Sequence, residues 1–268
     1  MDFGDIEELV LLGCGKMGSA LLQGWLASGL DPARVWVVEP HPSDWLQSQG
    51  VNLNAPLPEA PSVVLVAVTP QMIREAVPDL ERFGAGGTLF VSIAAGTTLA
   101  TFADLLGADA RVVRTMPNTP AAVGKGITAL VGNGKIDSKA MALAEGLLSV
   151  VGQTVVLDDE AEMDAVTGVS GSGPAYVFHL IETLAAGGEA EGLSPELALR
   201  LARATVAGAG ALAEAADESP GQLRVNVTSP AGTTAAALEV LMDEQSGFPA
   251  LLPRAVKAAA NRSRELGK

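Results

Sequence analysis

The chain has 268 residues, long enough for two modest domains, and 48% of them are hydrophobic. Its 17 basic and 31 acidic residues give a formal net charge of −14, which argues against a nucleic acid partner because such partners bind basic surfaces. The single cysteine, Cys14, excludes an internal disulfide and a thiolate-rich metal cluster, and the acidic N-terminus without an apolar run of about 18 residues predicts a cytoplasmic protein that does not span a membrane.

A strand, a glycine turn, a helix and a second strand are predicted between residues 7 and 39. The apolar run at 9–12 ends in the segment Gly13-Cys14-Gly15-Lys16-Met17-Gly18, after which apolar residues recur at helical spacing. A second apolar run at 35–38 closes with Glu39, about twenty residues beyond the last glycine. This spacing between glycines and acid is the fingerprint of a dinucleotide-binding turn.

Each glycine of this turn has a physical task. Gly13 allows the tight turn, Gly15 lets main-chain amides approach a diphosphate, and Gly18 lets the helix lie close to the strand. The N-terminus of the helix adds unpaired N–H groups and a partial positive charge. The stretch is therefore predicted to bind a dinucleotide, and an ordinary turn with Lys16 as an exposed basic residue is the alternative.

The rest of the N-terminal half alternates between strands and helices. We predict strands at 63–68, 88–93, 111–114, 127–131 and 154–157, with helices between them that include 99–106 and 138–150. Right-handed crossovers then give a doubly wound (Rossmann) parallel sheet of the α/β class, in which ligands lie beyond the carboxyl ends of the strands. Loops at that edge are predicted at 13–18, 69–70, 94–97 and 115–120, and the prolines of the last loop make it irregular and rigid.

Beyond residue 158 the predicted strands stop, and Ala, Gly, Leu and Glu recur at helical spacing. We predict a dinucleotide-binding domain over 1–158 and an all-helical domain over 159–268. Its predicted helices span 160–169, 173–191, 195–216, 219–227, 233–244 and 248–265. The small side chains of 206–211 indicate that helices approach one another closely there.

Two loops that precede predicted helices carry hydroxyl groups. Ser172 is placed to cap a long helix with Pro174 in its first turn, and neither Ser170 nor Ser172 has the flanking glycines of a hydrolase nucleophile. The segment 226–234 brings hydroxyls and main-chain amides to another helix start, where a substrate carboxylate could dock. Helix capping alone is the alternative for both loops.

The remaining chemically active side chains favour structural roles. The acidic run at 158–164 is typical of a solvated helix start, with a metal site as the alternative. No other histidine or cysteine lies at ligand spacing from His41 or His179, so we expect a surface turn for His41 and a packed helix position for His179. No general acid or base is evident, and a cofactor must therefore carry the difficult part of the chemistry.

The order of these motifs resembles the pyrroline-5-carboxylate reductase family over essentially the whole chain. The motifs that carry the resemblance are the glycine turn, Ala67-Val68-Thr69-Pro70, Ser92-Ile93-Ala94-Ala95-Gly96, Met116-Pro117-Asn118-Thr119-Pro120, residues 169–176 and residues 229–234. The resemblance implies hydride transfer from NADPH or NADH to the C=N carbon of a five-membered imino acid, which gives L-proline. It also implies a homodimer with interleaved helical domains, or a higher homo-oligomer.

The resemblance further implies roles for individual residues. The hydroxyl of Thr234 would hydrogen-bond the imine nitrogen, and the amides of Gly232 and Thr233 would hold the carboxylate. Ser229 and Ser172 would belong to the substrate site. The cofactor would contact Gly13, Cys14, Gly15, Lys16, Met17, Gly18, Glu39, Ala67, Val68, Thr69, Pro70, Ala95, Pro117, Asn118 and Asn226, and no metal is implied.

The chain departs from the family pattern at Thr69, where the family usually has lysine, and at Ala231, where a pair of glycines usually begins. Thr69 removes a cofactor contact, and Ala231 is expected to restrict the substrate loop. Glu39 can accept from a ribose 2′-hydroxyl but would repel a 2′-phosphate, which favours NADH. If Glu39 pointed away, Arg34, His41 and Ser43 could bind a 2′-phosphate. The biosynthetic role that the family implies also favours NADPH. The choice between NADH and NADPH therefore stays open.

Three other functions fit parts of the sequence. A β-hydroxyacid dehydrogenase shares the fingerprint but needs a catalytic lysine on a helix of the second domain. Beyond residue 139 the only lysines are Lys257 and Lys268, and both lie near the C-terminus, which counts against this function. An imine reductase for another cyclic imine is compatible with the same motifs. A non-catalytic dinucleotide sensor is the third alternative, although the sequence has no DNA-binding or signalling appendage.

Overall fold

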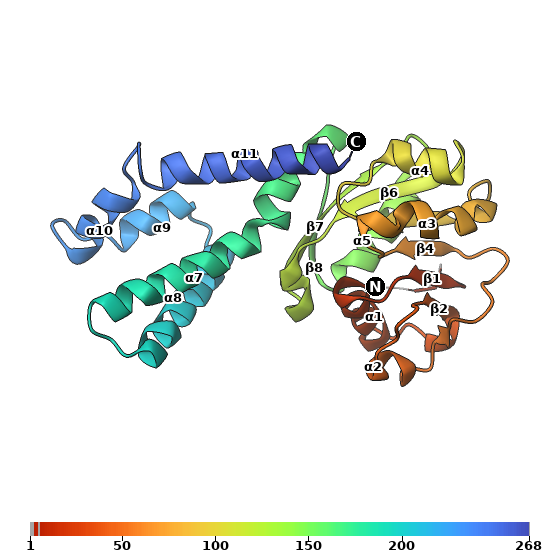
Figure 1. Ribbon diagram of the computed structural model, residues 1–268, viewed down its shortest axis with the longest axis horizontal. Helices are drawn as coiled ribbons and strands as arrows, with labels where there is room; N and C mark the ends of the chain where they lie inside the picture. Colours follow the sequence, from red (N-terminus) through yellow and green to blue (C-terminus); the bar gives the residue numbers. More distant parts are fainter. Residues whose placement is uncertain (1–2, 5, 268) are drawn as a thin grey trace. The chain divides into compact units, whose positions relative to one another are not determined.

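A computed structural model describes residues 3–4 and 6–267, and the chain forms two compact units (Figure 1). The first unit comprises Met1–Gly171 with Ala259–Lys268, and the second comprises Ser172–Ala258. The compact units therefore differ from the division expected after residue 158. Residues 159–171 and the end of the last helix pack with the first unit rather than with the other helices.

The first unit contains an eight-stranded sheet with the order β3-β2-β1-β4-β5-β6-β7-β8. The strands are β1 Leu9–Leu12, β2 Val35–Val38, β3 Asn52–Leu53, β4 Val63–Val66, β5 Leu89–Ser92, β6 Arg111–Met116, β7 Gly126–Gly132 and β8 Gly152–Val156. The expected doubly wound sheet is confirmed for β1 to β6, which are all parallel. The two-residue strand β3 is too short to give a periodic pattern, and the sequence analysis missed it.

Strand β7 corrects the expectation of a wholly parallel sheet, because it runs antiparallel to β6. The connection 117–125 is shorter than the dozen or so residues that a parallel crossover needs, so the chain can only turn back. Within that connection Thr119–Val123 forms a 3₁₀ turn, in a loop that was expected to be irregular. The helix α5, Ser138–Ser149, then provides the crossover that makes β8 parallel to β7.

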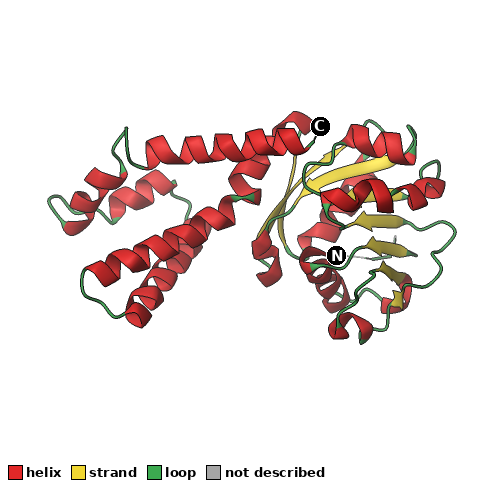
Figure 2. Cartoon of the chain, in the orientation of Figure 1, coloured by secondary structure: helices red, strands yellow, loops and turns green. Residues whose placement is uncertain are grey.

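Helices cover both faces of this sheet because its central strands are apolar on both sides (Figure 2). All four residues of β1, β4 and β5 are buried. One core packs Leu9 and Leu11 against Trp25, whose indole N–H donates to the carbonyl of Leu147 at 2.7 Å. The other packs Val10 and Leu12 in the cluster that contains Phe90 and Phe102. Burial on both faces fixes the register of the strands and hence the edge at which they end.

The helices agree with the predicted positions in most places. They are α1 Lys16–Ala27, α2 Asp44–Gln47, α3 Ile73–Ala76, α4 Leu99–Leu106, α5, α6 Met163–Val166, α7 Gly173–Ala190, α8 Pro195–Ala215, α9 Pro220–Asn226, α10 Thr233–Leu241 and α11 Phe248–Leu266. Ser194 and Ser219 cap α8 and α9 with their side chains. Ser172 makes no such bond, which corrects the expected cap. Its backbone is already helical because the π-helical turn Thr167–Gly171 leads into α7.

Two carboxylates of the acidic run 158–164 bind neighbouring elements, whereas Asp158, Asp159 and Glu162 are exposed, as expected of a solvated helix start. Glu160 pairs with Arg114 of β6 at 2.6 Å and accepts from the amide of Leu99 at 2.9 Å. Asp164 accepts from the hydroxyl of Ser263, near the end of α11, at 2.6 Å. These bonds hold residues 160–164 and the last turns of α11 on the sheet unit. They explain why the compact unit extends past residue 158.

The second unit has a small core made of small side chains. Ala185 of α7 and Ala198 and Ala202 of α8 are buried together, and a Cβ added to Gly188 would lie 3.3 Å from that of Ala198. The helices therefore approach closely at these positions. The close approach expected at 206–211 is not made by the two glycines there, Gly208 and Gly210, around which a Cβ would meet nothing within 4 Å. In the described part of the chain, no helix combines the length and the apolarity that crossing a membrane requires.

Candidate dinucleotide and substrate sites

The loops that follow β1, β2, β4, β5 and β6 meet at one edge of the sheet. These strands are parallel and in register, so their carboxyl ends lie side by side. The amide of Gly13 donates to Val38 at 2.8 Å, and the amide of Ala67 donates to Leu12 at 2.7 Å. These bonds extend the strand ladder into the loops and bring together predicted cofactor residues that are distant in the sequence.

The glycine turn has the geometry that the sequence predicted. Gly13 has φ +87°, and a Cβ there would lie 2.9 Å from the carbonyl oxygen of Ala67. A Cβ on Gly18 would lie 2.6 Å from the oxygen of Gly13. Around Gly15, in contrast, a Cβ would meet nothing within 4 Å, and the residue is exposed. The turn is therefore packed against the protein at Gly13 and Gly18 and open for a ligand at Gly15.

The amides available to an anion are those of the first turn of α1. Lys16, Met17 and Gly18 begin the helix and have no acceptor four residues earlier, whereas Ser19 donates to Gly15 at 2.9 Å. The amide of Cys14 is not available, because it donates to Glu39 Oε2 at 2.8 Å. The site can therefore hold a diphosphate on the helix start, with the Cys14 amide serving the turn itself.

Glu39 points toward the glycine turn. Besides the Cys14 amide, its carboxylate accepts from the amide of His41 at 3.0 Å, through Oε1. The side chain of Asn54 holds the backbone of Glu39 by accepting from its N–H and donating to its carbonyl, both at 2.9 Å. Asn54 was missed by the sequence analysis. Its positive φ of 51° suits asparagine, but nothing in the surrounding sequence marked it as a partner of Glu39.

The Cys14 thiol is expected to resist alkylation. Burial, followed by the negative charge of Glu39, raises its pKa from 9.0 to about 11. At about pH 8 such a thiol is roughly 100-fold less ionised than an unperturbed one, and the thiolate is the nucleophile. We expect iodoacetamide to label the native protein about 100-fold more slowly than the urea-unfolded chain, measured by mass spectrometry. Because the chain has one cysteine, equal rates would contradict this prediction directly.

The shifted pKa also sets a direction for stability. The pKa of Cys14 in the folded state lies above the ordinary value, so the folded state holds its proton more tightly. The protonated thiol therefore adds to the stability of the folded protein. This stabilisation is fully present below pH 9.0 and is lost as the pH rises toward about 11.

The loops after β4 and β5 complete the edge beside the turn. Ala67 and Val68 lie against Gly13, which is why β4 ends at Val66, two residues earlier than predicted. Thr69 is exposed, and Pro70 begins the 3₁₀ turn Pro70–Met72. Ala95 is half-buried in the loop after β5, next to Gly96. Gly96 has φ +75° and approaches Leu266 of α11, so this loop is covered by the end of the last helix.

Asn118 joins the loop after β6 to the π-helical turn. Its side chain donates to the carbonyl of Ser170 at 3.2 Å and accepts from the amide of Ile127 at 3.0 Å. Pro117 before it is buried. The amide group has two N–H bonds, and among the described residues only the Ser170 carbonyl accepts from it, so one N–H is left for a ligand. Asn118 therefore braces β7 and the turn 167–171 in addition to facing the predicted cofactor edge.

The predicted substrate loop lies in the second unit, before α10. The amide of Gly232 donates to the carbonyl of Ser229 at 3.1 Å and so closes the turn, while the contact expected between this amide and a carboxylate stays a prediction. Thr233, Thr234 and Ala235 form the first helical turn, and their amides have no acceptor four residues earlier. A Cβ on Gly232 would displace the hydroxyl of Ser229 and would lie 3.1 Å from the carbonyl oxygen of Ser229, so this position is tightly packed.

Ala231 adopts a backbone conformation that favours glycine, with φ +56°. A side chain there costs about 1 to 2 kcal/mol relative to glycine. Ala231 therefore adopts the left-handed backbone conformation that a glycine of the family pattern would adopt, at a cost in conformational strain.

The remaining candidates occupy surface positions. Asn226 is exposed at the end of α9 and accepts from Gln222 at 2.7 Å. His179 is not packed, contrary to expectation: its side chain is 75% exposed and lies 3.1 Å from Glu182. His41 is exposed in the turn after β2, as expected. Arg34 and Ser43 are engaged elsewhere, since Arg34 donates to the Ile6 carbonyl and Ser43 caps α2.

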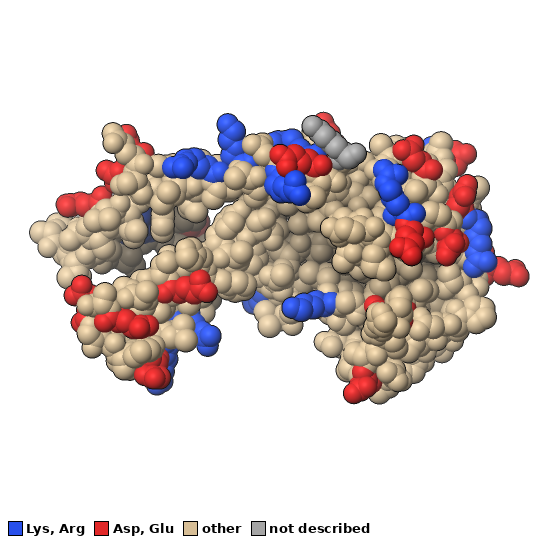
Figure 3. Space-filling view, viewed as in Figure 1, with Lys and Arg blue, Asp and Glu red and all other residues tan. Residues whose placement is uncertain are grey.

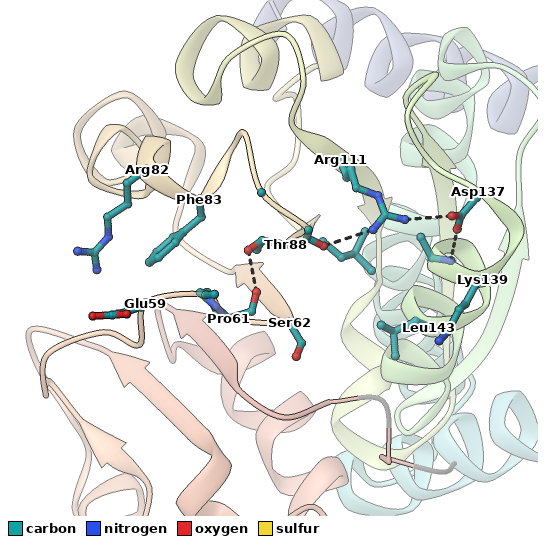
Figure 4. Close-up of a pocket in the computed structure, with 15 residues that line it drawn as sticks. Glu59, Pro61, Ser62, Arg82, Phe83, Thr88, Arg111, Asp137, Lys139 and Leu143 are labelled. Carbon is teal, nitrogen blue, oxygen red and sulfur yellow. Dashed lines mark hydrogen bonds and ion pairs between the residues drawn. The ribbon is translucent and has the colours of Figure 1, made fainter.

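A hollow of about 470 Å³ lies at the opposite end of the strands (Figure 4). Arg111, at the start of β6, bridges the Gly87 carbonyl and the Asp137 carboxylate, each at 3.3 Å. Thr88 donates to the Pro61 carbonyl at 2.7 Å. These bonds join the amino ends of the strands. The residues that line this hollow include none of the predicted site residues, so it is separate from the dinucleotide edge.

Comparison with known proteins extends the resemblance to the whole chain. Residues 160–266 match the model described as pyrroline-5-carboxylate reductase dimerisation, and residues 8–96 match that of NADP oxidoreductase, coenzyme F420-dependent. A pyrroline-5-carboxylate reductase of Arabidopsis thaliana is 41% identical over 96% of this chain and 94% of its own. The structure of a pyrroline-5-carboxylate reductase from Coxiella burnetii has a TM-score of 0.91 and 34% identity, covering 98% of this chain and 99% of its own. The Plasmodium falciparum enzyme with NADP bound has a TM-score of 0.84 and 28% identity, covering 97% and 98%.

Proposed function

The chain belongs to the pyrroline-5-carboxylate reductase family, and on this premise we propose that it reduces 1-pyrroline-5-carboxylate to L-proline with NADH or NADPH, the last step of proline biosynthesis. The observation that carries the proposal is the match of the whole chain, in sequence and in structure, to reductases of that name. The open glycine turn supports it, because a diphosphate fits against Gly15 where a side chain would meet no protein atom within 4 Å.

The chemistry requires that the imine carbon gain a hydride and that the nitrogen gain a proton. The reduced nicotinamide supplies the hydride when it is bound, and C=N becomes CH–NH. The amides of Lys16, Met17 and Gly18 hold the diphosphate. Holding the donor and the acceptor at reacting distance lowers the barrier by several kcal/mol, so these residues act mainly by positioning.

The first turn of α10 holds the substrate in this proposal. The amides of Thr233 and Thr234 bind the carboxylate, aided by the partial positive charge of the helix start. The hydroxyl of Thr234 forms a hydrogen bond with the imine nitrogen, the atom that gains the proton. Ser229, which accepts the Gly232 amide through its carbonyl, fixes the loop, and Ser172 belongs to the same site by family resemblance.

We place the nicotinamide end of the cofactor beside the loop after β6. Pro117 and Asn118 form that loop, and Asn118 has one N–H left for the carboxamide. Ala67 to Pro70 and Ala95 lie along the cofactor, and Asn226 is a cofactor residue by family resemblance. The half-buried free thiol of Cys14 supports a reducing, cytoplasmic location.

The apolar surface of the second unit supports the proposed homodimer. In this unit only the three core alanines are buried apolar residues, whereas large side chains on every helix are exposed, among them Phe178 57%, Leu201 49%, Leu212 54%, Val240 70% and Leu252 44%. Figure 3 shows wide areas without charged side chains over these helices. A single copy thus leaves much apolar surface in water, and a second copy with interleaved helices would bury it.

The test of the proposed function is direct turnover. Purified protein with 1-pyrroline-5-carboxylate should oxidise NADH or NADPH at about 1 to 1,000 turnovers per second, measured by the loss of reduced nicotinamide absorbance. 1-Pyrroline, which lacks the carboxylate, should give a kcat/KM roughly 100-fold lower, because charge-assisted hydrogen bonds contribute about 1.5 to 3 kcal/mol each. Failure to oxidise either dinucleotide with the carboxylated imine would reject the proposal.

A further inference from the structure

We propose that Glu39 makes this protein select NADH over NADPH. The proposal deepens the proposed function, on which it rests for the identity of the reaction, and concerns the ribose that carries the adenine. The two dinucleotides differ there by a single group, a 2′-hydroxyl in NADH and a 2′-phosphate in NADPH. The residue at the end of β2 faces that group when the diphosphate lies on the glycine turn.

Four hydrogen bonds hold Glu39 at the turn, two to its carboxylate and two to its backbone. Oε2 accepts from the Cys14 amide at 2.8 Å, and Oε1 accepts from the His41 amide at 3.0 Å. The side chain of Asn54 binds both the N–H and the carbonyl of Glu39 at 2.9 Å. Swinging the carboxylate away to admit a phosphate would leave the Cys14 amide, in a half-buried turn, without its acceptor. Each oxygen keeps a lone pair for a ribose hydroxyl.

The negative charge of Glu39 acts within the turn. It contributes, after burial, to the raised pKa of the Cys14 thiol, whose amide it accepts. No ion pair to Glu39 is found among the described residues. A dianionic phosphate placed beside this carboxylate would therefore meet uncompensated repulsion, whereas a hydroxyl would donate to it.

No lysine or arginine stands ready to neutralise a 2′-phosphate in this part of the chain, where the one histidine is His41, whose amide donates to Glu39. The sequence has no lysine or arginine from Val35 to Ile73, a segment that includes β2, α2, β3 and β4 with their loops. Arg34 lies before β2, at the other end of the strand and about 16 Å along it from Glu39, and donates to Ile6. Lys16 begins α1, where its charge acts on the diphosphate that both dinucleotides share.

The experiment measures binding without substrate. Wild-type protein is titrated with NADH and with NADPH at about pH 8, where an ordinary imidazole carries no charge, and the dissociation constants are obtained from nicotinamide fluorescence. We expect the Kd for NADPH to be at least tenfold above that for NADH. Glu39→Gln should reduce this ratio at least fivefold, mainly through tighter NADPH binding. Glu59→Gln, which removes an exposed charge on the hollow at the opposite end of the strands, should leave the ratio unchanged.

The outcomes separate this proposal from the proposed function. A wild-type ratio of one or less, or an unchanged ratio in folded Glu39→Gln protein, would overturn the role of Glu39. If the variant unfolds, competition of 2′-AMP and 5′-AMP for NADH on the wild-type protein decides: stronger binding of 2′-AMP would overturn the proposal, and weaker binding would support it. Selective NADH binding without imine reduction would reject the proposed function and leave the selectivity standing.

Discussion

Replacing Gly15 by alanine is expected to weaken dinucleotide binding by about 30- to 100-fold while the protein folds as before. The added Cβ would meet no protein atom within 4 Å, so the packing of the turn does not change. Gly15 has φ −68° and ψ −160°, which alanine adopts readily. The methyl group would instead occupy the space that a diphosphate needs against the amides of α1. Losing one charged hydrogen bond costs about 1.5 to 3 kcal/mol, which is the basis of this estimate.

The stability of the Gly15→Ala protein should stay close to that of the wild type. Alanine is a poorer helix cap than glycine, but it also reduces the entropy of the unfolded chain, and the two effects are of similar size. Thermal unfolding measures stability, and nicotinamide fluorescence measures binding. Gly134→Ala is the matched control, because a Cβ there also meets nothing within 4 Å and Gly134 lies outside the site. Wild-type affinity in folded Gly15→Ala protein would show that the diphosphate does not lie on this turn.

Gly18→Ala provides a contrast from the same turn. Its Cβ would lie 2.6 Å from the carbonyl oxygen of Gly13, so the helix or the turn must shift before any ligand binds. Loss of binding in that variant would combine a folding defect with a binding defect. The two glycines thus have separable functions, close packing at Gly18 and access at Gly15, which the spacing of the motif alone cannot distinguish.

The parts of the fold that depend on local pattern could be predicted from the sequence. Apolar runs such as 9–12 and 63–66 are buried on both faces, and the glycine turn between β1 and α1 has the required positive φ at Gly13. The acid at the end of β2 also reaches the turn, as the spacing indicated. In each case a short segment determines its own conformation, and the parallel sheet then places the segment ends together.

The parts that depend on contacts between distant segments were not predictable in the same way. The partners of Glu160 and Asp164 are Arg114 and Ser263, which no local pattern connects to them, and they determine where the first unit ends. Asn54 and Asn118 act by binding backbone groups, which every residue has, so their partners leave no signal in the sequence. The segments α7 to α11 are predictable as helices, but no local pattern shows what covers their exposed apolar side chains.

The predicted substrate loop contains one feature that local pattern reveals and one that it does not. The sequence indicated that a helix start follows Ser229, and α10 begins at Thr233. It could not show that the Gly232 amide closes the turn onto Ser229, whereas the amides of Thr233 and Thr234 have no acceptor four residues earlier. The hydroxyl of Thr234 therefore stands on the same helical turn as the amides proposed to hold the carboxylate, and its role can be tested separately from theirs.

Replacing Thr234 by valine is expected to lower kcat by about 100-fold or more, the usual contribution of a positioned proton donor. Valine is β-branched like threonine and has a similar helix propensity, so the first turn of α10 and its amides should remain in place. The KM for the carboxylated imine should then change far less than kcat, and dinucleotide affinity should not change. Thr234→Ser keeps the hydroxyl and should recover most of the activity, measured by steady-state kinetics. Wild-type turnover in Thr234→Val, or equal losses in the valine and serine variants, would remove the hydroxyl from the mechanism and leave α10 with carboxylate binding alone.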